Sequence, residues 1–479
     1  MITPTPSQLS PSGLPAQRLD AAGRPRVDGR AVLALALPLV ANSAVQTILN
    51  LTDLWFIGHI STTALASVGA VNWLVVAVVL LLAGSGMAVQ TCVAQCYGAG
   101  RYARAAQATW SGLWGILCVA PLFVAVAFSS HYILAPFGIG HEIEATAARF
   151  WLPRVAGAPL GVAVWGALGF FNGIGRPRTT VVITLIITCV NVILNRVFIF
   201  DFGLGVAGSA WASTCAQGVG LASTLLVFLS ARYRREFRTH LMWRPRRAVL
   251  WAQFRLGFPM GLTGASDLIG ISLFQLMQVR LGSIDGAATQ LVMASTAIAY
   301  MPGVGVAQAG TTLVGQSIGA GNRAWAMRVG THVVFMAAVL MGGIGVLLAL
   351  AGPWVLPLLL TSQDAATAAV LREGAVLLWF AAAYQFFDGL NIASSFCLRG
   401  AGDTLVPGAL VLVMSWFLFV PLAHILTFAP GGGFLHFLPQ LGYGARGGWV
   451  AVVLYILMLG SVLFARWRLG AWQKISLRA

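Results

Sequence analysis

Uncharged apolar runs of about 20 residues or more recur along this chain of 479 residues, and they constrain its fold more than any other feature. A helix of about 20 apolar residues can cross the ~30 Å hydrocarbon core of a membrane, because each residue adds ~1.5 Å. Hydrophobic residues make up 58% of the chain and charged residues 9%, whereas about 25% of a soluble protein is charged. The sequence therefore predicts an all-α integral membrane protein.

Twelve transmembrane helices are expected, which places both termini on the same side of the membrane. Their approximate ranges are 31–57, 65–95, 106–129, 147–172, 179–200, 205–230, 250–280, 288–318, 329–351, 370–397, 405–428 and 447–466. Placing the termini in the cytoplasm puts 23 of the 29 Lys and Arg residues on the cytoplasmic side, as the positive-inside rule requires. Because Arg is strongly preferred over Lys, a bias of GC-rich bacteria, we expect a bacterial inner membrane protein with both termini cytoplasmic.

The chain is expected to divide into two six-helix halves between a disordered N-terminal tail and a short C-terminal tail. The expected segments are the tail 1–30, the first lobe 31–231, an Arg-rich cytoplasmic linker 232–249, the second lobe 250–466 and the tail 467–479. The basic residues of the linker are more easily explained by membrane topology than by a bound partner, so no nucleic-acid partner is expected.

Sequence repeats indicate that the two halves are pseudo-symmetric bundles. The run "QCYGAGR" from Gln95 resembles "QSIGAGN" from Gln316, and Pro38 and Pro259 are separated by the same interval. The Gly-x-Gly at Gly173 likewise resembles the one at Gly400. These glycines are expected to form turns at helix ends, because a phosphate-binding loop would need a preceding strand and a Walker-type Lys. In transporters built from two parallel repeats, the substrate path lies between the halves.

Polar residues lie on single faces of four of the predicted spans. A carboxylate at membrane depth costs about 2.5–3.5 kcal/mol on insertion scales, so Asp53 in the first span should face protein or water rather than lipid. The four faces carry Asn42, Gln46, Asn50 and Asp53; Thr184, Thr188, Asn191 and Asn195; Thr263, Asp267, Gly270 and Gln278; and Tyr384, Asp388, Asn391 and Ser395. Because polar groups at membrane depth must be satisfied by one another or by water, these faces predict a hydrated interior cavity.

Three acids, Asp53, Asp267 and Asp388, lie well within predicted spans without a deep basic partner. The candidate basic residues in helices, Arg196 and Arg280, are expected near the outer ends. Unpaired carboxylates favour a cation brought from outside, which can be a proton, a sodium ion or a cationic substrate. The alternative is that the acids only join neighbouring helices.

With these residues described, the chain resembles the multidrug and toxic compound extrusion (MATE) transporters, in particular the bacterial NorM-like group. The resemblance covers about residues 30–470. It is carried by "LTDLWFIGH" in the first span, "VNVILNRVFIF" in the fifth, "GFPMGLTGASD" in the seventh and "YQFFDGLNIASSFCLRGAGDT" in the tenth. It implies two lobes that alternate between inward and outward openings and export organic cations against entry of Na⁺ or H⁺. It also implies a protein with no enzymatic activity or cofactor, expected to be a monomer in the lipid membrane.

The resemblance also implies which residues bind the coupling ion and substrate. Asp53 matches the acid of an N-lobe cation site, to which Asn191 and Asn195 also belong, although many members carry Asp at the position of Asn195. Asp267 and Asp388 match the C-lobe acids, and the family usually has Glu at the former. A Na⁺ site is therefore expected either at Asp53, Asn191 and Asn195 or at Asp267 and Asp388. Further cavity-lining candidates are Asn42, Gln46, Asn50, Thr188, Gln278, Tyr384 and Asn391.

Two alternative functions remain. A lipid-linked oligosaccharide flippase of the same superfamily should have Arg residues facing its cavity to hold a diphosphate, whereas this sequence offers acids at depth. A membrane-embedded lipid-modifying enzyme should have clustered Asp or His residues at a membrane face, and the three deep acids lie on separate helices.

Overall fold

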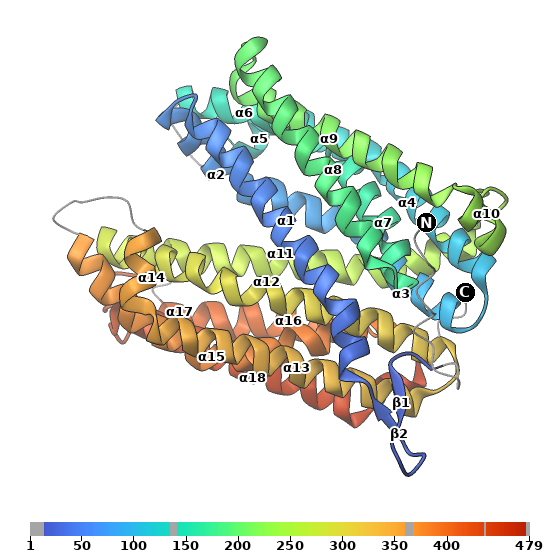
Figure 1. The fold of residues 1–479 in the computed structure, drawn as a ribbon. Coiled ribbons are helices and arrows are strands. Elements are labelled where there is room, and N and C mark those ends of the chain that lie inside the picture. The colour runs from blue at the N-terminus through green and yellow to red at the C-terminus, as the bar shows by residue number, and fades with distance from the viewer. Residues whose placement is uncertain (1–13, 135–140, 360–366, 435–436, 476–479) are drawn as a thin grey trace.

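Long helices account for nearly all of the computed structural model, which describes residues 14–134, 141–359, 367–434 and 437–475 (Figure 1). Eleven helical segments among these residues are long and apolar enough to cross a membrane, and the bent pair α2–α3 makes a twelfth. The prediction of an all-α membrane protein with twelve spans is confirmed. Helices are suited to the membrane interior because all their backbone hydrogen bonds are made within the helix, and the surrounding hydrocarbon offers no other partners.

The first half of the chain forms six spans, two of which are broken. Its elements are α1 (Gly29–Gly58), α2 (Thr62–Leu82), α3 (Gly84–Gly98), α4 (Tyr102–Phe128), α5 (Ser130–Leu134), α6 (His141–Ala156), α7 (Ala158–Gly173), α8 (Pro177–Arg196), the π-helical turn η2 (Val197–Asp201), α9 (Gly205–Phe228) and α10 (Ala231–Phe237). Helices α2 and α3 make one span bent by 49°, and α6 continues into α7.

The second half forms the other six spans. Its elements are α11 (Arg247–Leu281), α12 (Ser283–Gly319), α13 (Arg323–Leu350), α14 (Gly352–Leu359), α15 (Thr367–Ala401), α16 (Leu405–Met414), the π-helical turn η3 (Ser415–Phe419), α17 (Val420–Thr427), α18 (Gly444–Leu469) and the 3-10 turn η4 (Ala471–Lys474). Together α16, η3 and α17 make one span.

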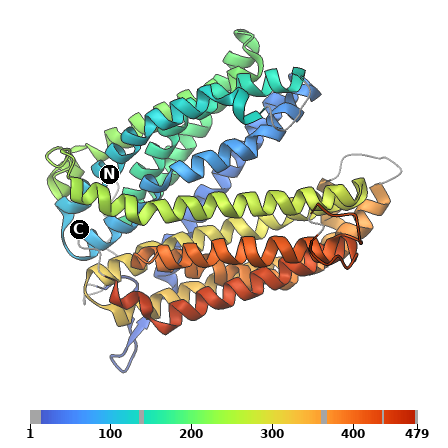
Figure 2. The same ribbon diagram turned by 180° about the vertical axis from the view of Figure 1, so that it is seen from behind.

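The two halves lie side by side as separate bundles, which we call the N-lobe and the C-lobe (Figures 1 and 2). In both views the blue-to-green helices form one bundle and the yellow-to-red helices the other. Helix α1 packs against α8 of its own lobe and against α12 of the C-lobe, and α3 also packs against α12. The first span therefore contributes its polar residues at the junction of the lobes.

Hydrogen bonds join the lobes at the end of the molecule where α10 and the two-stranded hairpin described below lie, which we call the terminal end (Figure 1). Gln95 of α3 donates its amide N–H to the carbonyl oxygen of Gly400, at 2.9 Å, and Gln316 of α12 donates to that of Gly173, also at 2.9 Å. These are the repeated motifs of the two halves, so each Gln bonds to the Gly-x-Gly of the opposite lobe. The Gln residues of the repeat therefore join the lobes, a role that turn chemistry alone did not predict.

Two further contacts complete this set of bonds, which we call the interlobe seam. Gln90 of α3 donates to the carbonyl of Gln308 at 3.2 Å and to Thr312 Oγ1 at 3.0 Å. Thr312 in turn donates to the carbonyl of Asn172 at 3.0 Å. The seam consists of neutral hydrogen bonds, which are individually weak, so the lobes can separate without exposing buried charge.

A close backbone approach places α11 of the C-lobe in the bend between α2 and α3. A methyl group on Gly257 would overlap the carbonyl group of Gly84, and one on Gly84 would overlap that of Gly257. Only glycine permits this separation, as in other small-residue helix contacts in membranes. The bend and the glycine pair together bring α11 into close contact with α3.

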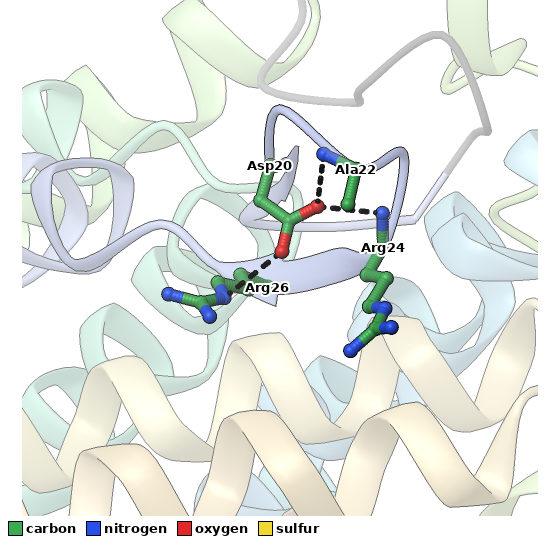
Figure 3. A network of polar contacts seen from close by, with 4 residues as sticks. All are labelled: Asp20, Ala22, Arg24 and Arg26. Atoms are coloured by element: carbon green, nitrogen blue, oxygen red, sulfur yellow. Dashed lines mark hydrogen bonds and ion pairs between the residues drawn. The ribbon is translucent and has the colours of Figure 1, made fainter.

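The predicted disordered tail is wrong for part of its length, because a two-stranded hairpin occupies residues 17–27. Strands β1 (Gln17–Leu19) and β2 (Pro25–Val27) pair antiparallel, and Asp20 closes the turn between them (Figure 3). Its Oδ1 accepts from the backbone N–H groups of Ala22 and Arg24, at 3.0 and 2.8 Å. Its Oδ2 lies 3.3 Å from Arg26 Nε. The sequence did not predict this hairpin because its turn is held by hydrogen bonds of the Asp20 side chain, which produce no periodic pattern of hydrophobic residues. Residues 1–13 of the predicted tail lie outside the described residues.

The linker and the C-terminal tail are also packed where the structure describes them. In the linker, Phe237 is buried, and the indole of Trp110 donates to the carbonyl of Thr239 at 2.8 Å. In the tail, Trp472 is buried and stacks on Trp467 with ring centroids 4.8 Å apart. The predicted boundaries at 249 and 467 each fall inside a helix, since α11 begins at Arg247 and α18 ends at Leu469.

Candidate functional site

Asp53 of α1 lies in a cluster of neutral hydrogen-bonding groups inside the N-lobe. Its Oδ1 accepts from Asn195 Nδ2 at 2.7 Å, and its Oδ2 accepts from Ser213 Oγ at 2.9 Å. Asn191 Oδ1 accepts from Asn195 Nδ2 at 3.0 Å, and Asn191 Nδ2 donates to Ser213 at 3.2 Å. The structure thus brings together the three residues expected in the N-lobe, and we call them with Ser213 the Asp53 cluster.

The position of the cluster follows from helix periodicity. Asn191 and Asn195 are one turn apart on α8, so both face α1 and α9, and both are fully buried. Ser213, from α9, was missed by the sequence interpretation, although its face of α9 also carries the buried Ser209. The polar face of the sixth span, which carries Ser209 and Ser213, was therefore a sequence signal that could have predicted this residue.

An acceptor in the cluster has no partner within the described part of the chain. The side-chain oxygen of Asn195 is buried and accepts no hydrogen bond there. Asp53 itself is only half-buried and has no ion-pair partner among the described residues. A carboxylate without a counterion beside an unpaired amide oxygen favours a small cation, because hard cations prefer such oxygens.

The other polar residues of α1 face two cavities. Asn42 and Gln46 line a cavity of about 210 Å³ between the lobes, which we call the interlobe cavity. Gln46 and Asn50 line a second cavity of about 270 Å³ within the N-lobe, the N-lobe cavity. Because both cavities share Gln46, Trp165 and Leu168 as lining residues, they adjoin. Thr188 does not line either cavity and donates to the carbonyl of Thr184 at 2.9 Å.

The C-lobe holds the other two deep acids. Asp388 Oδ1 accepts from Asn391 Nδ2, which lies one turn further along α15, at 3.3 Å. Asp267 of α11 is close enough to Asp388 for electrostatic interaction. Tyr384, one turn before Asp388, is buried with its ring stacked on Trp449. The structure therefore brings Asp267, Asp388, Tyr384 and Asn391 into one region, separate from the Asp53 cluster.

Gln278 lies apart from this region. It is fully buried, and neither polar atom of its amide has a hydrogen-bond partner among the described residues. It packs against Gly448 of α18. It does not line either of the two cavities.

Arg399, in the last turn of α15, lines the interlobe cavity and corrects the sequence interpretation. The sequence placed Arg399 in a loop, whereas the structure has it within α15, lining the interlobe cavity. Its guanidinium carbon lies 4.6 Å from the centre of the Phe396 ring, and it interacts electrostatically with Asp267. The predicted span ended before Arg399, whereas α15 continues past it to Ala401 and carries its side chain to the interlobe cavity.

No group of three or more His, Cys, Asp or Glu side chains that could hold a metal ion occurs in the described ranges. Asp53 accepts hydrogen bonds from an amide and a hydroxyl group, and Asp388 accepts one from an amide. These surroundings favour a monovalent cation or a proton over a tightly bound divalent metal.

Comparison with known proteins agrees with this architecture. The MatE family model matches residues 38–197 and 259–425, more than half of the chain. The chain is 29% identical to the probable multidrug resistance protein NorM of Burkholderia pseudomallei over 455 residues, 92% of each chain. It is also 29% identical to that of Pseudomonas putida over 419 residues, 85% of this chain and 90% of the relative.

Solved structures show the same fold. An outward-facing multidrug resistance MATE family transporter of the MOP superfamily matches with a TM-score of 0.81 at 20% identity, over 94% of this chain and 96% of the other. A MATE protein in the straight conformation matches with a TM-score of 0.80 at 20% identity, over 93% and 96%. With the family model matched over both halves, the chain belongs to the MatE family of multidrug transporters and is not an enzyme.

Proposed function

We propose that the protein is a secondary active exporter of organic cations, driven by entry of H⁺ or Na⁺. Its family membership supports multidrug efflux. The observation that carries the coupling proposal is the Asp53 cluster, in which both carboxylate oxygens accept from neutral donors. A charge held in this way within a membrane span is costly, which argues that the site exchanges a cation with its surroundings.

The cluster offers two ways to bind the coupling ion. A proton would bind to Asp53 directly. A sodium ion would be held by the carboxylate together with the side-chain oxygens of Asn191, Asn195 and Ser213, which lie within hydrogen-bonding distance of one another or of Asp53. In both cases Asn195 and Ser213 can turn away from the Asp53 carboxylate and stay within the cluster, because each also forms a hydrogen bond with Asn191.

The C-lobe acids supply a second cation-binding region for this exchange. Asp267 and Asp388 interact electrostatically with each other, so a cationic group between them would relieve their repulsion. If ion and substrate favour different arrangements of the lobes, each lowers the affinity for the other, and linkage makes this antagonism reciprocal. One positive charge moving inward across 100 mV contributes ~2.3 kcal/mol to export.

The closed interlobe seam at the terminal end supports an outward-facing state. The terminal end carries most of the basic residues, so we assign it to the cytoplasm of a bacterial cell, with both termini inside. The interlobe seam joins the lobes at this end. Opening of the seam would then give the inward-facing state of an alternating-access cycle.

Transport in proteoliposomes tests the proposal. Ethidium movement is followed under a pH gradient and under a Na⁺ gradient, with the membrane potential clamped. We expect one gradient to drive transport and Asp53→Asn to abolish it without loss of folded protein. Transport at the unmodified rate by Asp53→Asn would remove this residue from coupling.

A milder variant tests the cluster geometry. Ser213→Ala removes one donor to Asp53, and a change of about 1 kcal/mol alters the apparent affinity for the coupling ion about fivefold. A sodium ion should bind more weakly because it loses a ligand oxygen, whereas a proton should bind more tightly because the ionised carboxylate loses a donor. Ser209→Ala is the matched control, because Ser209 is also buried, lies one turn away on α9 and makes no hydrogen bond with Asp53. Equal ion affinity in both variants would contradict the proposed role of Ser213.

The flippase alternative gains one observation from the structure, because Arg399 lines the interlobe cavity. A flippase should move a lipid-linked diphosphate rather than an organic cation, so the same vesicles separate the two functions. Failure of both gradients to move several organic cations would favour the flippase.

A further inference from the structure

The charged residues that line the two cavities are both basic. Among the described residues, the interlobe cavity is lined by Arg399 and no Asp or Glu, and the N-lobe cavity by Arg154 and no Asp or Glu. The remaining polar lining residues of the interlobe cavity are neutral amides and hydroxyls, among them Asn42, Gln90 and Asn172. The deep acids thus lie outside both linings, and the charged groups on the cavity walls are positive.

Arg399 has unused binding capacity towards the interlobe cavity. Its guanidinium forms no hydrogen bond or ion pair with another described residue, although it carries five N–H donors. Arg399 interacts electrostatically with Asp267, but the two side chains are not within ion-pair distance of each other. A half-buried guanidinium in a cavity, without a direct counterion, is ready to hold a carboxylate or phosphate oxygen.

The surroundings of Arg399 add selectivity for a flat organic molecule. The Phe396 ring lies against the guanidinium and also lines the cavity, as does Trp165 from the opposite lobe. The rings can pack against an apolar scaffold while the guanidinium binds an anionic group at its edge. Since α15 carries Arg399 and α7 carries Trp165, both lobes would contact one bound molecule.

From this arrangement we propose that the interlobe cavity is an anion-binding subsite, in which Arg399 holds a carboxylate or phosphate group of the exported molecule. The inference rests on the proposed export function and adds to it a substrate class, namely organic solutes that carry an anionic group as well as a flat apolar part. The negative group binds in the cavity, and any cationic group of the same molecule remains available to the acids.

Equilibrium binding with two matched dyes tests the subsite without any ion gradient. Rhodamine 110 carries a free carboxyl group, which is methylated in rhodamine 123, so their affinity ratio isolates the anionic group. Fluorescence anisotropy with the purified full-length protein measures both affinities. We expect the ratio in favour of rhodamine 110 to fall about tenfold in Arg399→Gln, as loss of one charge-assisted contact predicts.

Two further variants complete the test. Arg399→Lys keeps the positive charge and should retain most of the preference for the carboxylate. Arg372→Gln removes an exposed charge from the same helix and should leave the ratio unchanged. An unchanged ratio in Arg399→Gln, an equal loss of both dyes, or no binding of rhodamine 110 to the unmodified protein would each overturn the proposal.

Competition identifies the source of the anionic group. Displacement of rhodamine 110 by benzoate but not by phosphatidylglycerol supports a soluble organic anion. Displacement by phosphatidylglycerol alone would assign the cavity to a lipid headgroup and overturn the assignment to an exported solute. Because no gradient is present, the failure of ion coupling would leave these binding results unchanged, so the two proposals fail separately.

Discussion

Removing the two reciprocal Gln bonds of the interlobe seam should shift the protein away from the state seen here. In the variant Gln95→Leu/Gln316→Leu the side chains keep a similar size but lose the amide N–H groups that donate to Gly400 and Gly173. A neutral hydrogen bond contributes about 0.5–1.5 kcal/mol net, so two bonds contribute about 1–3 kcal/mol. The ratio of closed to open seam should therefore fall by a factor of about 5 to 150.

The distance between the lobes at the terminal end is the direct measurement. Spin labels at Arg101→Cys and Arg323→Cys, both exposed at the starts of equivalent helices, report this distance by pulsed electron paramagnetic resonance. The six native cysteines are replaced first. Distances are recorded across a pH series, so that a shift in the balance is visible even where one state dominates. We expect a longer-distance population to grow in the double variant.

The control for this experiment is Gln385→Leu. Gln385 is a buried glutamine of α15 whose amide has no partner among the described residues, so its loss should not affect the seam. If the double variant gives the same distances and populations as the unmodified protein at every pH, the Gln pair does not stabilise the closed seam. A shift of equal size in Gln385→Leu would also refute the reasoning, because it would show a general effect of losing buried amides.

Two further predictions concern packing. Gly257→Ala forces α11 away from Gly84 at a cost of about 1–3 kcal/mol, so it should lower the thermal midpoint and transport. Gly264→Ala on the same helix meets only ordinary side-chain contact and should change neither, and equal behaviour of the two variants would contradict the close-approach argument. Asp403→Asn leaves Arg466 without the carboxylate that lies 2.7 Å away, and it should destabilise the protein by about 3 kcal/mol in thermal unfolding. Adding Arg466→Gln should recover part of that loss, and no recovery would show that the charge of the pair is not what matters.

The spans and the two halves were predictable because membrane insertion depends on local properties of the chain. An apolar run of sufficient length forms a helix in hydrocarbon whatever its neighbours are, since its backbone bonds are internal. The polar faces were also predictable, because the helical period fixes which residues lie together. Asn191 and Asn195 share a face of α8, and the structure places both beside Asp53.

Contacts between distant segments were not predictable in the same way. Ser213 bonds to Asp53 across 160 positions of sequence, and nothing near either residue specifies the other. The Gln repeats were visible, but their partners are backbone carbonyls, which have no residue signature. Arg399 was assigned to a loop because the predicted span ended at residue 397, whereas α15 continues to Ala401.

The sequence by itself determined that this protein is a two-lobed helical membrane protein with three deep acids. These features are predictable because hydropathy and helical periodicity depend only on residues that are consecutive in the sequence. Only the tertiary structure decided that Asp53 is bonded by neutral groups alone among the described residues, that the lobes join through reciprocal glutamines, and that the interlobe cavity is lined by a basic residue. Those features depend on how helices far apart in sequence are turned towards one another, which side-chain packing between the lobes sets.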